Sequence, residues 1–173
     1  MELVIELLKI LIPPLLVFIS GYYVMRKMLE QEREKMKLQI RKEKAKDFTP
    51  IKLQAFERLI LFLERISPNN MILRTHKTGM SARYLHLELI KTIRTEYEHN
   101  LVQQLYISHP AWQMVTGAKE EMLKLVNVAT AGLQKDATAN DLSKIIVEKT
   151  SEVKNLPTTV AISYLKKEMR RMF

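Results

Sequence analysis

The junction between Met25 and Arg26 constrains this chain more than any other feature. Residues 10–25 carry no charged side chain. Residues 26–46 then carry nine Lys or Arg against four Glu, which supplies more than half of the net charge of +9. A long uncharged run that ends in a basic stretch is typical of a helix leaving a membrane. We therefore predict a transmembrane anchor over residues 1–25.

The uncharged run alone is short for a bilayer. Its sixteen residues span roughly 24 Å as a helix, against a hydrocarbon core of roughly 30 Å. Extending the helix back to Leu3 includes Glu6 and Lys9, which lie one turn apart and near an interface, where their charges can pair. The other end is predicted to lie at the membrane interface, where aromatic and basic side chains gather. Its interface residues are Tyr22, Tyr23, Arg26 and Lys27.

Two other interpretations of this run stay open, a cleaved signal peptide and a buried core helix. A signal peptide needs a positive n-region and a small-x-small cleavage site, whereas the residues before this uncharged run include two glutamates, and no Ala-x-Ala follows it. A core helix is not required, because residues 47–173 are numerous enough to form a core without it. The anchor is the interpretation we favour.

Residues 26–46 are predicted to continue the anchor as a basic helical stalk. They contain no Gly or Pro and many strong helix formers. Leu29 and Met36 fit the a positions of a coiled-coil seam. Glu32 and Gln39 fall at the d positions, where a coiled coil needs apolar residues, so the seam is weak. The stalk is either a solvated charged helix or a basic face lying on anionic headgroups, and the two differ in their sensitivity to salt.

Residues 47–173 are predicted to form an all-α bundle of roughly five helices, since neither strand alternation nor an internal repeat is present. Start signals are Thr49-Pro50, Ser81, Ser108, Thr138 with Asp141 three residues on, and Pro157. The predicted helices are 51–66, 81–106, 108–133, 138–155 and 157–173. Met71–Gly79 is predicted to be irregular, with at most a short turn.

Glu96 and His99 form a Glu-x-x-His, the spacing that ferritin-like bundles use to hold a metal. No second copy exists in the chain. At 100° per residue, Glu96 falls at the edge of the apolar face of its helix, His99 falls outside it, and His86 falls near its middle. A lone histidine there is typical of a buried, hydrogen-bonded residue. We predict no metal site and no cofactor, with these three residues as the only candidates.

Other catalytic sets lack their parts. The absence of cysteine excludes disulfides, thiolate metal sites and thiol nucleophiles. No serine lies in a Gly-x-Ser-x-Gly turn, and the four glycines form no phosphate-binding loop. Trp112, Met114 and Met122 are predicted to be core residues. Positive charge is the one feature that favours nucleic-acid binding, because the basic stretch has no interleaved aromatic residues and no recognition motif.

Two segments, LQAFERLILFLERISPNNMILR (53–74) and LELIKTIRTEYEHNLVQQLYIS (87–108), resemble a family of small uncharacterised proteins from Bacteroidota. Members resemble this chain along essentially its whole length. The resemblance implies a bacterial source and the organisation of hydrophobic helix, charged stalk and helical domain; it implies no activity. It also draws attention to a polar interaction surface that comprises Glu64, Arg65, Asn69, Asn70, Glu98 and Asn100, beside Glu96 and His99.

The sequence thus predicts a single-pass protein of the bacterial inner membrane, with its N-terminus outside and residues 47–173 in the cytoplasm. We predict that it is not an enzyme but a scaffold or adaptor within a larger envelope assembly. Its expected partners are membrane lipids and either another protein or a second copy of itself. The alternatives are a metal-dependent or lipid-acting enzyme that uses the Glu-x-x-His, and a membrane-tethered nucleic-acid binder.

Overall fold

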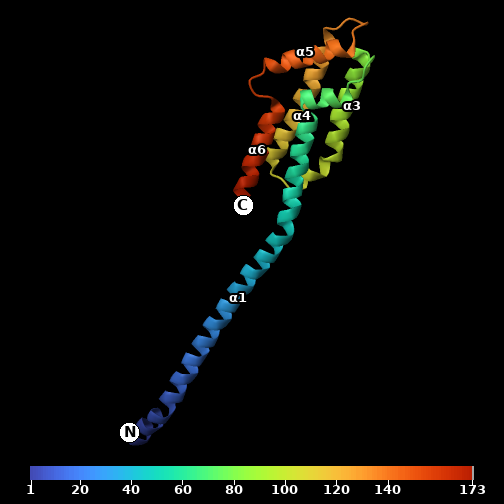
Figure 1. The fold of residues 1–173 in the computed structure, drawn as a ribbon. Helices are drawn as coiled ribbons and strands as arrows, with labels where there is room; N and C mark the ends of the chain where they lie inside the picture. Colours follow the sequence, from blue (N-terminus) through green and yellow to red (C-terminus); the bar gives the residue numbers. More distant parts are fainter. Residues whose placement is uncertain (173) are drawn as a thin grey trace. The chain divides into compact units, whose positions relative to one another are not determined.

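A computed structural model describes the backbone of residues 1–172, and the side chains of these residues other than 2–9, 13 and 41–47. This part of the chain is helical and contains no β-strand (Figure 1). The helices in order are α1 (Glu2–Arg65), α2 (Pro68–Thr75), α3 (Ala82–His99), the 3₁₀ helix η1 (Leu101–Leu105), α4 (His109–Ala131), α5 (Ala139–Ser151) and α6 (Pro157–Met172). The predicted all-α fold is confirmed.

The chain divides into two compact units, Met1–Thr49 and Pro50–Phe173, and α1 contributes to both. The prediction that a separate helix starts at Thr49-Pro50 is wrong, because α1 is assigned as one helix through these residues. Proline has a φ close to the helical value and removes a single backbone donor. Its ring also clashes with the carbonyl four residues earlier, so a Thr-Pro pair favours a helix start over a helix interior, and α1 is an exception to this local preference.

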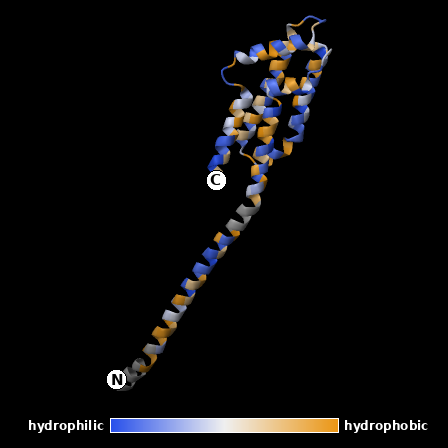
Figure 2. Cartoon of the chain, in the orientation of Figure 1, coloured by the Kyte–Doolittle hydropathy of each residue, from blue (hydrophilic) through white to orange (hydrophobic). Residues whose placement is uncertain are grey.

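The first unit contains a segment, Ile10–Ile40, that is long and apolar enough to cross a membrane. Its most apolar window has no buried residue, unlike the core helix of a soluble protein, although a signal sequence near an N-terminus has the same composition. Figure 2 shows the apolar stretch followed by a polar one along α1. Tyr22 and Tyr23 are exposed, and Arg26 pairs with Glu30 one turn further on at 3.4 Å.

The second unit has its own hydrophobic core. Within it α4 packs against α3 and α6, and α5 lies across the ends of α3 and α4 (Figure 1). The last turns of α1 belong to this core, because their apolar side chains recur every three or four residues and face inward. The fully buried large side chains are Phe56, Leu59, Phe62, Leu63, Ile66, Met71, Leu85, Leu89, Ile93, Met122, Leu142 and Ile146. Of the predicted core residues outside this set, Trp112 and Met114 are half-buried against it.

Three helices begin at the predicted caps. The Ser81 hydroxyl accepts a hydrogen bond from the backbone N–H of Tyr84 at 3.3 Å, and the Ser108 hydroxyl accepts one from Ala111 at 3.2 Å. Thr138 starts α5 with a capping box. These side chains satisfy backbone donors that have no partner inside the helix, which is why the three starts could be predicted from local sequence.

The segment after α1 differs from its prediction. Residues 71–79 were expected to be irregular, but α2 covers Pro68–Thr75, with Ser67 at its N-cap and Pro68 in its first turn. Pro68 can both end one helix and start the next, whereas the sequence-based prediction placed only the end of a helix here, at residue 66. The chain then turns through Gly79, whose φ of 79° is a left-handed conformation that glycine adopts without strain.

Two helix ends also differ from their predictions. α3 ends at His99 rather than near Tyr106, and the tighter η1 helix follows it. α5 ends at Ser151 rather than near Asn155. Neither end has a glycine or proline at the point where the helix stops, so the sequence carries no strong stop signal there.

Candidate functional site

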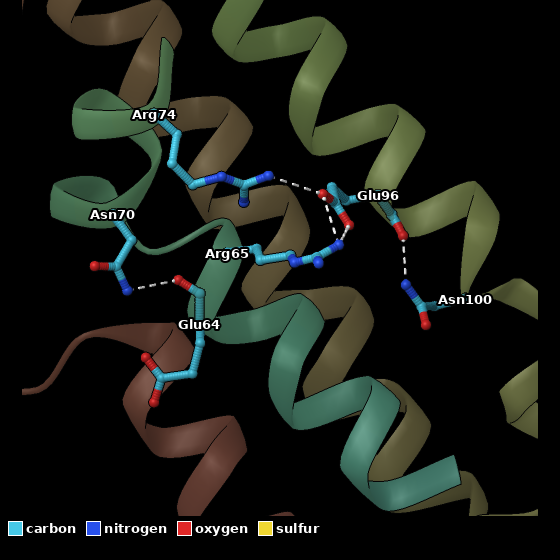
Figure 3. A network of polar contacts seen from close by, with 6 residues as sticks. All are labelled: Glu64, Arg65, Asn70, Arg74, Glu96 and Asn100. Atoms are coloured by element: carbon cyan, nitrogen blue, oxygen red, sulfur yellow. Dashed lines mark hydrogen bonds and ion pairs between the residues drawn. The ribbon is translucent and has the colours of Figure 1, made fainter. Parts of the chain in front are cut away.

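Glu96 on α3 is the centre of a polar cluster that joins three helices. Its two carboxylate oxygens lie 3.1 and 3.2 Å from one guanidinium nitrogen of Arg65 at the end of α1. Arg74 of α2 approaches the same carboxylate at 3.5 Å (Figure 3). The Glu96 side chain is 14% exposed, whereas the two arginines are 44% and 49% exposed. We refer to Arg65, Arg74 and Glu96 as the Arg–Glu cluster.

The backbone of Glu64 forms the second part of the site. Its carbonyl oxygen accepts hydrogen bonds from the Asn70 amide at 3.0 Å and from the Ser67 hydroxyl at 2.7 Å. These two donors satisfy a carbonyl at the end of α1 that has no helical partner. The Glu64 carboxylate itself points away from the Arg–Glu cluster (Figure 3). Asn70 thus has a structural role, closing the corner between α1 and α2.

The remaining residues of the predicted interaction surface differ in whether they are buried or exposed, and the two arginines pair with Glu96 rather than with their side chains. Asn100 is only 9% exposed, and its amide donates to the backbone carbonyl of Glu96 at 2.7 Å. Its side chain is therefore used inside the fold, at the end of α3. Asn69, Glu98 and His99 are exposed. The structure brings Glu64, Arg65 and Asn70 together and adds Arg74, while Asn100 lies inward of them.

An aromatic column fixes the position of this end of α3. Tyr97 packs between Phe62 of α1 and Trp112 of α4, with ring-centroid distances of 6.0 and 5.5 Å. The Lys119 ammonium lies 4.5 Å from the centre of the Tyr97 ring, a cation–π contact. Because Tyr97 is adjacent to Glu96, the column holds the carboxylate where the arginines of α1 and α2 can reach it.

The candidate metal ligands are not assembled into a metal site. Glu96 is engaged by two guanidinium groups, while His99 is exposed. His86 is half-buried rather than central in the core, and its Nε2 lies 2.8 Å from Oδ1 of Asn127. Among the side chains that the structure describes, no three His, Asp or Glu lie where they could share a metal ion.

A shallow groove of about 440 Å³ runs beside the Arg–Glu cluster. It is lined by Leu61, Glu64, Arg65, Asn70, Leu73 and Arg74. Leu61 is 51% exposed and Leu73 is 81% exposed. The groove therefore combines aliphatic and charged groups, a composition that is common where one protein binds another.

Arg74 is the member of this site that sequence reasoning missed. It lies one helical turn after Asn70, so both face α1 once residues 68–75 are helical. The signal was present in Ser67-Pro68, which places a proline in the first turn of a helix. Because this segment was predicted to be irregular, the sequence did not predict which way the Arg74 side chain points.

The fold and the site define an all-helical protein with an apolar N-terminal helix and a compact C-terminal helical unit. The chain belongs to the family of unknown function DUF7935, whose family model matches residues 2–172. This match agrees with the predicted uncharacterised family and covers both units. No match to the chain is found among curated proteins or among solved structures.

Proposed function

We propose that this protein is a single-pass membrane protein whose helical unit serves as a scaffold or adaptor. The observation that carries the proposal is the exposed apolar surface of α1. Its eight large apolar side chains between Ile10 and Ile19 are 49% to 76% exposed. Leaving them in water costs on the order of 10 kcal/mol relative to burial, which is comparable to the net stability of a whole domain. A lipid bilayer removes this cost.

The proposed topology follows from charge. Lys9 is the only basic side chain before the apolar run, whereas nine Lys or Arg follow within residues 26–46. Basic residues near the end of a span stay on the cytoplasmic side. The N-terminus then lies outside, and residues 47–173 lie in the cytoplasm. With the source that the resemblance to Bacteroidota proteins implies, the membrane is the bacterial inner membrane.

The role of scaffold rests on the groove beside the Arg–Glu cluster. Leu73 is almost fully exposed, and it lies between Asn70 and Arg74 on a helix of only eight residues. Arginine and large apolar side chains are enriched among residues that dominate protein–protein binding. Glu96 already neutralises part of the charge of both arginines, so a partner need not supply two acids. We propose that the groove binds a protein partner in an envelope assembly.

Site-specific photo-crosslinking in native membranes tests this role. A photoreactive amino acid is placed at Leu73 of the full chain, and the matched control is placed at Val147, which is exposed on α5. We expect a discrete adduct from position 73 that is absent from position 147 and lost in Arg74→Glu. Equal adducts at both positions, or none at position 73, would refute the partner surface. Thermal unfolding of Arg74→Glu checks that the fold is retained.

A further inference from the structure

One end of the second unit combines exposed aliphatic side chains with exposed cations, and the proposed partner groove does not use it. On η1, Leu101, Val102 and Leu105 are 42%, 61% and 74% exposed. Arg170 and Arg171 are exposed in the last turn of α6. We refer to these five residues as the η1–α6 surface.

A hydrogen-bonded contact holds the two elements of this surface together. The carboxylate of Glu168 accepts from the backbone N–H of Ser108 at 3.1 Å and from its hydroxyl at 2.5 Å. Ser108 follows η1 by three residues, and Glu168 precedes Arg170 by two. The basic end of α6 is thereby fixed beside η1, although the two are about 60 residues apart in sequence. The contact also binds the one acidic side chain among the last six residues of the chain.

In and just before η1, two polar side chains are buried and three aliphatic side chains are exposed, the opposite of an ordinary surface helix. Gln103 is buried at 8% exposure, and Asn100 just before the helix is buried at 9%, while three aliphatic side chains face outward. Burying polar groups and exposing aliphatic ones is unfavourable in water. The packing of the unit does not account for the outward aliphatic side chains, which suit an apolar or interfacial environment outside it.

We propose that the η1–α6 surface docks on the anionic headgroups of a membrane, with the aliphatic side chains of η1 entering the interface. Surfaces that combine apolar groups with Lys and Arg bind anionic lipids in this way. Each cation near such a membrane strengthens binding roughly fivefold. Lys166 and Lys167, one turn earlier on α6, are also exposed. The inference rests on the proposed anchor and on a basic stalk that lies along the headgroups, because residues 26–49 would, as an upright helix, hold the second unit roughly 36 Å from the bilayer.

The arrangement of the second unit supports this docking. The C-terminus of α6 lies at the end of the bundle where α3 connects to α4 through η1 (Figure 1). The chain also enters this unit at the same end, through the part of α1 that begins at Pro50 (Figure 1). The part of α1 that belongs to this unit thus begins at the end that carries the η1–α6 surface (Figure 1).

Charge and chemistry argue against other occupants. A second copy docked symmetrically would bring Arg170 and Arg171 toward the same cations of its partner, which is unfavourable. A nucleic acid would bind the cations, but Val102 and Leu105 offer no ring on which a base could stack. An anionic bilayer satisfies both halves of the surface.

The test exploits the absence of cysteine from the chain. Val102→Cys in the full chain is labelled with an environment-sensitive fluorophore and reconstituted into vesicles that contain brominated phosphatidylcholine, with or without phosphatidylglycerol. The control site is Gln134→Cys, which is exposed in the connection between α4 and α5. We expect quenching at position 102 in anionic vesicles and none at position 134. Neutralising both cations with Arg170→Gln and Arg171→Gln should weaken docking roughly 25-fold and remove most of the quenching.

The outcomes separate docking from anchoring. Flotation of the protein with the vesicles but no quenching at position 102 would overturn docking and leave the anchor intact. Failure to float would refute the anchor. Equal quenching in neutral and anionic vesicles, unaffected by the two Gln substitutions, would overturn recognition of anionic headgroups. The label at position 102 could also be shielded from water to the same extent in detergent as in anionic vesicles, in a protein that is dimeric. That result would show that a second copy covers the surface and would overturn the proposal.

Discussion

Asp141 and Thr138 form a reciprocal pair at the start of α5. The Thr138 hydroxyl and backbone N–H donate to the Asp141 carboxylate at 2.7 and 2.9 Å, and the Asp141 backbone N–H donates back to the hydroxyl at 3.3 Å. The hydrogen bond from the Thr138 side chain is the largest of the effects that lower the pKa of Asp141; the Thr138 N–H and the nearby Lys144 act in the same direction. The ionised carboxylate therefore stabilises the folded state.

The pH dependence of stability follows from the sign of this shift. A carboxyl group with a lowered pKa in the folded state contributes stability above its unfolded pKa and loses that contribution as the pH falls through the folded value. We expect Asp141→Asn to lower the unfolding temperature at neutral pH. The difference from wild type should shrink as the pH drops below about 4, where the unfolded carboxyl becomes protonated.

Thermal unfolding of the full chain in detergent, followed by circular dichroism from pH 7 to acid, measures this effect. Asp136→Asn, in the loop before α5, is the matched control and should change the unfolding temperature little. A deficit of Asp141→Asn that stays constant through the acid range would contradict the role assigned to the carboxylate.

Local residues of this kind were predictable from the sequence, but paired residues were not. The caps at Ser81, Ser108 and Thr138 act within three residues of themselves, so their signal lies in one short segment. Arg65 and Glu96 are 31 residues apart, and the Ser108–Glu168 contact spans 60. Such pairs depend on how helices pack, which residue types and spacing do not specify.

At the scale of elements, the Arg–Glu cluster links α1, α2 and α3 through a single carboxylate. Because both arginines are about half exposed, solvent screens their attraction and each pair contributes modestly. We expect Glu96→Gln to lower the free energy of unfolding by about 1 kcal/mol, since the amide keeps one hydrogen bond but loses the charge between two cations.

Denaturant unfolding of the full chain in detergent measures this loss. Glu98→Gln is the matched control, because Glu98 is two residues away on the same helix and exposed. The control should leave the free energy of unfolding nearly unchanged. Equal effects of the two substitutions would show that Glu96 does not link the helices.

Element boundaries show where sequence reasoning succeeds and fails. The starts of α3, α4, α5 and α6 were predicted because each has a cap or a proline. The short helix α2 was missed, since eight residues give too little periodicity to reveal a helix. η1 was merged with α3 because its apolar residues extend the helical pattern, although they face outward.

The whole molecule consists of two units that differ in how their apolar side chains are covered. The second unit buries its own core, whereas the described apolar side chains of Ile10–Ile40 remain exposed. The family match extends over both, so the apolar helix and the helical unit occur together in DUF7935. We propose that the first unit fixes location and that the second presents the partner groove.

The accessibility of single cysteines tests the proposed topology. Glu2→Cys, Val17→Cys and Ser151→Cys are made one at a time in the cysteine-free chain and treated with a membrane-impermeant maleimide in intact spheroplasts and after lysis. We expect labelling at position 2 in intact spheroplasts, labelling at position 151 only after lysis, and none at position 17 in either sample. Labelling at position 151 in intact spheroplasts, or free labelling at position 17, would contradict this topology.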